Sequence, residues 1–163
     1  MYISVMRHGE ATPLQPQDAA RELTAFGRTQ AQNTGRYLQH FCEQLGHQKI
    51  DYCICSPYTR TQQTYAELST LMPVSAVEYN PLFTPSGDAQ QAHDYIDGLL
   101  AAKTQNSVQH LLLVSHMPLV SFLADSLDPQ FQTQIFATSS VLTLQYDSSK
   151  HSGKQIAFYQ ASA

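Results

Sequence analysis

The sequence predicts a three-layer α/β/α sandwich built around a mainly parallel central sheet. Short apolar runs alternate with longer segments in which apolar residues recur at helical spacing, and this alternation is typical of α/β proteins. The run at residues 110–115 is apolar almost throughout, as expected of a strand that helices cover on both faces. Because 163 residues suit one hydrophobic core, we expect residues 1–163 to form a single domain.

The first predicted elements are a short strand and a long helix. Residues 2–6 are β-prone, and the run stops at Arg7-His8-Gly9, where a loop should begin. After Thr24 the apolar side chains recur at helical spacing. Thr24 can cap the start of this helix and Gly46 can end it, so we expect a helix between these two residues.

The middle of the chain repeats the pattern of a strand followed by a helix. Residues 51–55 are predicted as a second strand, and a helix should open at Ser56-Pro57, because proline suits the first helical turn. This helix should reach about residue 72. Residues 74–78 are predicted as a third strand before a turn-rich loop at residues 81–87.

The last third of the chain should complete the sheet. Asp88 can cap a helix that extends to about Ala102. The remaining elements are predicted as a strand, a helix and an antiparallel hairpin, at residues 110–115, 118–127, and 141–146 with 155–159.

The composition excludes several functional classes. The formal net charge of −4 argues against a nucleic-acid binder, which needs a basic face, and no apolar run approaches the roughly 20 residues of a membrane span. Arg7, His8 and Glu10 interrupt the apolar N-terminus before it could act as a signal sequence. The cysteines are too few for a disulfide framework and lack the spacing of a metal site, so we expect a cytoplasmic protein with Cys42, Cys53 and Cys55 reduced.

Basic side chains follow three of the predicted strands. Arg7 and His8 follow the first, residues 56–60 with Arg60 follow the second, and His116 follows the fourth. The carboxyl ends of parallel strands lie at one edge of a sheet, so these groups should meet there. Two arginine forks and two imidazoles, with few acids in the same loops, favour binding of a multiply charged anion such as a phosphoryl group.

Histidine in such a site favours turnover over binding alone. A neutral imidazole can attack phosphorus and form a phosphohistidine that water then hydrolyses. We expect His8 to be this nucleophile, with the neighbouring arginines holding its ring neutral near pH 7. If it is partly protonated, His116 could stabilise charge on the oxygens of the transferred group.

Four ordered motifs carry a resemblance to a known family. They are Arg7-His8-Gly9-Glu10, Leu23-Thr24-Ala25-Phe26-Gly27, the Ser56-Pro57-x-x-Arg60-x-x-Gln63-Thr64 segment, and Val114-Ser115-His116. Together they resemble the histidine phosphatase superfamily, in its SixA-type branch. The resemblance implies a phosphoglycerate mutase-like fold, a phosphorylated nucleophile at His8, and a phosphate site completed by Arg7, Arg60 and His116. It also implies an additional phosphate-binding arginine at Arg21, for which a solvated loop position is the alternative.

The loop at residues 82–88 lacks the glutamate general acid found in many relatives that act on phosphate esters. An alkoxide leaving group needs such an acid, whereas the imidazole of a phosphohistidine leaves as a much weaker base. The chain also has little room for a large lid insertion. Both features favour a phosphohistidine phosphatase of the SixA type.

The resemblance implies as substrate a phosphohistidine on a phosphotransfer (HPt-type) or phosphocarrier protein of a signal transduction system. We expect a monomer that takes phosphate or a similar oxyanion in its site and uses no cofactor. Two alternatives stay open: a broad phosphomonoesterase or mutase that uses Glu10, Asp88 or His93 as a substitute acid, and a catalytically weak phosphate-recognition module. A metallophosphatase is disfavoured, because the acids and histidines do not form a clustered ligand set.

Overall fold

The computed structural model describes residues 1–103, 108–130 and 135–161. Within these ranges six strands form one sheet in the order β3-β2-β4-β1-β5-β6. β1, β2, β3 and β4 pair in parallel, while β5 runs antiparallel to both β1 and β6. The strands are β1 (Tyr2–Arg7), β2 (Tyr52–Cys55), β3 (Val77–Tyr79), β4 (His110–Ser115), β5 (Val141–Asp147) and β6 (Ser152–Tyr159).

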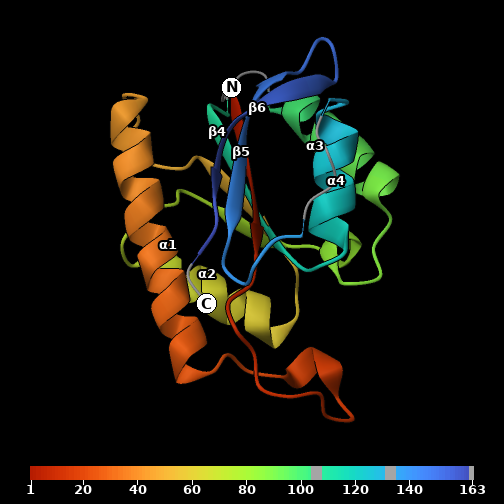
Figure 1. Cartoon of the computed structure of the whole chain (residues 1–163). Helices are drawn as coiled ribbons and strands as arrows, with labels where there is room; N and C mark the ends of the chain where they lie inside the picture. The colour runs from red at the N-terminus through yellow and green to blue at the C-terminus, as the bar shows by residue number, and fades with distance from the viewer. Residues whose placement is uncertain (104–107, 131–134, 162–163) are drawn as a thin grey trace.

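Helices cover both faces of the sheet, which confirms the predicted three-layer arrangement (Figure 1). The long helices are α1 (Ala25–Gln44), α2 (Thr59–Ser69), α3 (Ala89–Ala102) and α4 (Leu119–Leu127), with the short 3₁₀ turns η1 (Asp18–Ala20) and η2 (Pro81–Phe83). Helices α1 and α2 pack against one face, and α3 and α4 against the other. Among the described residues, no helix combines the length and the apolar character that a membrane span requires.

The two cores follow the alternation of side chains along each strand. Cys53 and Cys55 point into the core under α1 and α2, whereas Ile54 between them points into the core under α3 and α4. All six residues of β4 are buried, because this strand lies between two parallel neighbours and beneath helices on both sides. The prediction of a doubly covered strand at residues 110–115 is therefore confirmed.

The predicted helix caps are confirmed. Thr24 accepts a hydrogen bond from the backbone N–H of Gly27 at the start of α1, and Asp88 accepts one from Gln91 at the start of α3. Gly46, just beyond α1, has a φ of +78°, a conformation that glycine adopts without steric cost.

Several predicted boundaries differ from the structure, and helix α2 differs at both ends, since it also ends at Ser69 rather than at about residue 72. Helix α2 begins at Thr59, after a turn in which Ser56 Oγ accepts the backbone N–H of Tyr58. Strand β3 begins at Val77, and residue 74 only forms an isolated bridge to the segment before β2. Strand β6 begins at Ser152, three residues earlier than predicted, because the ladder with β5 extends to the turn.

Two glycines allow the loop after β1 to cross the first turn of α1 at close range. A Cβ atom at Gly9 would lie 2.5 Å from the carbonyl oxygen of Gly27, and a Cβ atom at Gly27 would overlap the carbonyl oxygen of Glu10. Both neighbours are backbone atoms, which cannot yield as a flexible side chain can. This crossing explains why the first two motifs each contain a glycine.

We predict that Gly27→Ala destabilises the protein, because the added methyl group forces these two backbones apart. Overpacking of this kind costs about 1–3 kcal/mol of unfolding free energy, measurable by chemical denaturation. Gly98→Ala is the matched control: it is also a helical glycine, but a Cβ atom there would have no heavy atom within 4 Å beyond the adjoining backbone of α3. At this position we expect a gain of about 0.5–1 kcal/mol. Equal effects at the two positions would contradict the close crossing as the cause.

Candidate active site

The register of the parallel strands brings three predicted segments together at one edge of the sheet. Arg7 lies opposite Ser115 in the β1–β4 pair, and Cys55 lies opposite Val114 in the β2–β4 pair. The ladder continues just past the strand ends: the His8 N–H donates to the Ser115 carbonyl (3.0 Å). His8, Ser56 and His116 therefore leave the sheet side by side, as the strand-end rule predicted.

His8 presents one unprotonated ring nitrogen, whose lone pair accepts a hydrogen bond from Arg60. Its Nδ1 lies 2.7 Å from the carbonyl oxygen of Gly9, which can only accept, so Nδ1 carries the proton. Its Nε2 lies 3.3 Å from Nε of Arg60, which can only donate. The residue is 7% exposed. Nε2 is thus the unprotonated atom, and it is held beside a guanidinium group.

Arg60 lies in the first turn of α2 with its side chain almost fully buried. Besides the contact with His8, its Nη1 donates to the carbonyl oxygen of Asp18 (2.8 Å) and its Nη2 to Oδ2 of the same residue (3.2 Å). The guanidinium carbon lies 5.1 Å from the ring centre of Tyr58, which adds a cation–π contact. Three separate groups therefore fix the orientation of this arginine.

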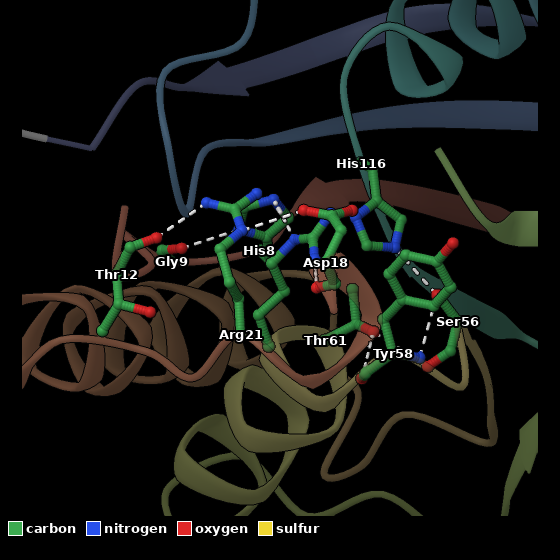
Figure 2. A network of polar contacts seen from close by, with 10 residues as sticks. His8, Gly9, Thr12, Asp18, Arg21, Ser56, Tyr58, Thr61 and His116 are labelled. Atoms are coloured by element: carbon green, nitrogen blue, oxygen red, sulfur yellow. Dashed lines mark hydrogen bonds and ion pairs between the residues drawn. The ribbon is translucent and has the colours of Figure 1, made fainter. Parts of the chain in front are cut away.

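His116 lies against His8, with ring centres 5.2 Å apart. Its Nε2 is 2.8 Å from Ser56 Oγ, and that oxygen already accepts the N–H of Tyr58 (Figure 2). When the serine proton points at Nε2, the proton of His116 lies on Nδ1. Nδ1 is buried and has no hydrogen-bond partner among the described residues. It is a donor available to a group that enters the site.

Arg7 and Arg21 complete the cluster of cations. Nη1 of Arg7 donates to the carbonyl oxygen of Phe136 (2.7 Å), and its buried Nε has no partner among the residues that the structure describes. Arg21 is not a solvated loop arginine: its side chain is 17% exposed, and its Nη1 donates to the carbonyl oxygen of Thr12 (2.8 Å). Figure 2 shows Arg21 beside His8 and Asp18. The charges of Arg7, Arg21 and Arg60 all act on the rings of His8 and His116, so the five predicted residues belong to one site.

Asp18 is a site residue that the sequence did not predict. Its carboxylate accepts Nε of Arg21 through Oδ1 (2.9 Å) and Nη2 of Arg60 through Oδ2 (3.2 Å). The chain places it there by folding residues 11–23 back on themselves, with a bridge between Ala11 and Leu23. The spacing of Asp18 and Arg21, three residues apart, was the one signal in the sequence for this pair.

Burial sets the charge of the His8 ring. It lowers the pKa of His8 to about 3, helped by the charges of Arg60, Arg7 and Arg21 and opposed by the hydrogen bond to Gly9. The ring is therefore neutral, as predicted. The predicted cause was the neighbouring arginines, whereas burial is the larger one.

The suggestion that His116 is partly protonated is wrong. Burial lowers the pKa of His116 to about 2, with smaller contributions from His8 and from Arg60, Arg21 and Arg7. His116 is therefore neutral, and its ring does not add a positive charge to the site.

Polar residues of the motif at residues 56–64 connect helix α2 to the loops that carry the site residues. Thr64 Oγ1 donates to the carbonyl oxygen of Arg60 (2.8 Å) and accepts the backbone N–H of Gly9 (3.0 Å). Gln63 Oε1 accepts the N–H of Leu23 (2.8 Å). These bonds tie helix α2 to the loop after β1 and to the loop that carries Arg21.

The three candidate substitute acids are engaged elsewhere. The Glu10 carboxylate accepts the hydroxyl of Thr24 (2.9 Å), and Asp88 caps α3. His93 bonds to Ser126 (2.7 Å) and Tyr146 (2.9 Å) on the other side of the sheet. Asp18 is the acid that contacts the site, and its pKa is lowered: burial alone would raise it, but the hydrogen bond from Arg21 and the charge of Arg60 outweigh burial. Asp18 is therefore ionised at neutral pH.

The fold and these motifs define an α/β protein with two imidazoles and three arginines at the carboxyl edge of its sheet. The family model of the histidine phosphatase superfamily (branch 1) matches residues 3–82. A phosphohistidine phosphatase SixA homolog of Haemophilus influenzae is 30% identical over 165 residues, which cover 99% of this chain and 96% of that protein. The chain belongs to the histidine phosphatase superfamily.

Two further similarities fall in the SixA branch. Phosphohistidine phosphatase SixA of Escherichia coli strain K12 is 30% identical over 151 residues, covering 91% of this chain and 88% of that protein. The solved structure of the protein histidine phosphatase SixA complexed with tungstate has a TM-score of 0.86 at 27% identity, and the match covers 98% of this chain and 97% of that one.

The depressed pKa values of His8 and His116 predict acid sensitivity of the fold. Unfolding exposes both rings, which then bind protons below their ordinary pKa of 6.5. Their contribution to stability is thus fully present above pH 6.5 and is lost as the pH falls from 6.5 toward 3. At pH 5 each ring should cost roughly 2 kcal/mol of unfolding free energy, as measured by urea denaturation. His116→Gln removes one titrating group, so the free energy of unfolding should depend less steeply on pH in this variant. An unchanged pH dependence would contradict the lowered pKa of His116.

Proposed function

We propose that this chain is a phosphohistidine phosphatase that removes phosphate from a phosphohistidine of an HPt-type or phosphocarrier protein through a covalent intermediate at His8. The observation that carries the proposal is the state of the His8 ring. Its Nδ1 proton is fixed by Gly9, and its Nε2 lone pair faces Arg60. A neutral nucleophile beside a fixed cation is the arrangement that attack on a phosphoryl group requires.

In the first step, Nε2 of His8 attacks phosphorus in line with the substrate's N–P bond. The substrate ring carries a proton on its other nitrogen. The new bond forms to Nε2, the electron pair of the broken N–P bond stays on the substrate ring, and that ring leaves as neutral imidazole while His8 keeps its own proton on Nδ1. Arg7, Arg21 and Arg60 stabilise the negative charge on the three oxygens that do not react, and Nδ1–H of His116 donates to one of them. In the second step, water attacks the phosphorylated His8, the N–P bond breaks, and inorganic phosphate leaves with the oxygen of the water.

The acids near the site favour an imidazole leaving group. Asp18 is ionised, so it has no proton to give, and Glu10, Asp88 and His93 are engaged away from Nε2 of His8. Loss of a positioned general acid costs about 10²–10⁴ in rate when an alkoxide must leave. A phosphorylated imidazole exchanges one N–P bond for another and has no such need.

We predict that His8→Ala abolishes turnover of a phosphohistidine-bearing HPt protein, because it removes the attacking atom. Release of ³²P-phosphate measures the loss, and rapid quenching of the wild type should trap label on His8 that then decays. His40→Ala is the control, because that histidine lies on the exposed side of α1. Turnover by His8→Ala near the wild-type rate would refute the mechanism. If the wild type binds the phosphorylated protein but releases no phosphate, a recognition module is favoured. If the wild type hydrolyses small phosphate esters faster than the phosphohistidine protein, a phosphomonoesterase is favoured.

We predict that Arg60→Lys fails to restore the activity that Arg60→Ala loses. The arginine donates from Nε, Nη1 and Nη2 to different partners, and a single ammonium group cannot reproduce this fork. We expect kcat to fall by about 10²–10³ for Arg60→Lys, as for the loss of one transition-state donor. Steady-state kinetics with the phosphorylated protein check this, and a lysine variant within about threefold of wild type would contradict it.

A further inference from the structure

Asp18 places a negative charge where the proposed function needs an anion to bind. Its two carboxylate oxygens accept from Arg21 and Arg60, two of the three arginines of the site. Nε of the same Arg60 lies 3.3 Å from Nε2 of His8, the proposed point of attack. The guanidinium group of Arg60 therefore contacts both the carboxylate of Asp18 and the nitrogen to which the phosphoryl group would be transferred.

We propose that Asp18 sets the affinity of the site for phosphate: its carboxylate competes with the phosphoryl group for Arg21 and Arg60, and so limits retention of the product. This inference rests on the proposed function, because it concerns the same anion. The chemistry of the competition is direct, since a carboxylate and a phosphate oxygen accept from the same N–H groups of an arginine.

The charge balance of the site supports this role. Both imidazoles are neutral, so the site's positive charge comes from Arg7, Arg21 and Arg60 alone. Three guanidinium groups around a phosphate ion would hold the product strongly, and release of product limits many enzymes. The carboxylate of Asp18 lowers the net charge of the site by one and so weakens the attraction of the site for the phosphate product.

The anchoring of the loop and the competing charge reside on different atoms of Asp18. The main-chain carbonyl oxygen accepts from Nη1 of Arg60 (2.8 Å) and from the backbone N–H of Arg21 (3.1 Å). Within the part of the chain that the structure describes, the side chain bonds only to the two guanidinium groups, and it is 39% exposed. Replacement of the carboxylate thus leaves the main-chain anchors of η1 in place, and the side chain has solvent into which it can move.

The test measures binding of inorganic phosphate by isothermal titration calorimetry. Asp18→Asn keeps the shape and one acceptor but removes the charge, and we expect its dissociation constant to fall by about tenfold at low ionic strength, after discounting for solvent screening. Asp18→Glu keeps the charge and should remain within about twofold to threefold of wild type. Asp94→Asn is the control, because it removes the same charge from the exposed face of α3. Equal or weaker phosphate binding by Asp18→Asn would overturn the proposal.

Asp18→Ala provides a second arm if the asparagine variant is poorly folded. It too should bind phosphate more tightly than wild type, and stronger inhibition of turnover by added phosphate should accompany the change. Failure of the two proposals can be distinguished. If the wild type hydrolyses the phosphohistidine protein but Asp18→Asn and Asp18→Ala bind phosphate no more tightly, only the role of Asp18 is wrong. If both variants bind phosphate more tightly but the wild type shows no turnover, the proposed function is wrong and the role in anion affinity holds.

Discussion

The parallel pairing of β1 and β2 with β4 is the constraint on which the site depends. Because Arg7 lies opposite Ser115 and Cys55 opposite Val114, three loops from distant parts of the chain leave the sheet at the same level. A shift of one residue in either pair would turn alternate side chains to the wrong face. The two buried cores fix this register, since each strand sends alternate apolar residues to each helical layer.

Burial affects the charge of the two kinds of basic side chain in the site differently. The imidazoles of His8 and His116 lose their protons easily, and burial keeps both neutral. Burial also lowers the pKa values of Arg7 and Arg60, but guanidinium groups start from 12.5 and stay charged. The same environment therefore supplies a neutral nucleophile and fixed cations, one of which, Arg60, is hydrogen-bonded to His8.

The sequence predicted those parts of the site that follow from local pattern and from sheet geometry. The strand ends near residues 6, 55 and 115 were recognisable as apolar runs, and the carboxyl-edge rule placed His8, Arg60 and His116 together. The turn before α2 was missed, because it depends on a serine side chain that bonds to the next loop residues. The protonation of His116 was misjudged, since it depends on burial by residues distant in sequence. Asp18 was missed for a similar reason: only the fold of residues 11–23 brings it to Arg60.

The arrangement as a whole supplies charge stabilisation without supplying protons. Asp18 is ionised and has no proton to transfer. His116 is a neutral ring: its Nδ1–H can donate a hydrogen bond, but it is far too weak an acid to protonate a leaving group. Among the described residues, the acid bonded into the site is ionised, so it has no proton for a leaving group that departs as a strong base, whereas a neutral imidazole leaves as a weak base and needs none. In the proposed mechanism, a preference for N–P over O–P bonds follows from which groups are charged, more than from the shape of the site. In such a site the positions of the three arginines and of the one carboxylate among them govern both capture of the phosphoryl group and its release.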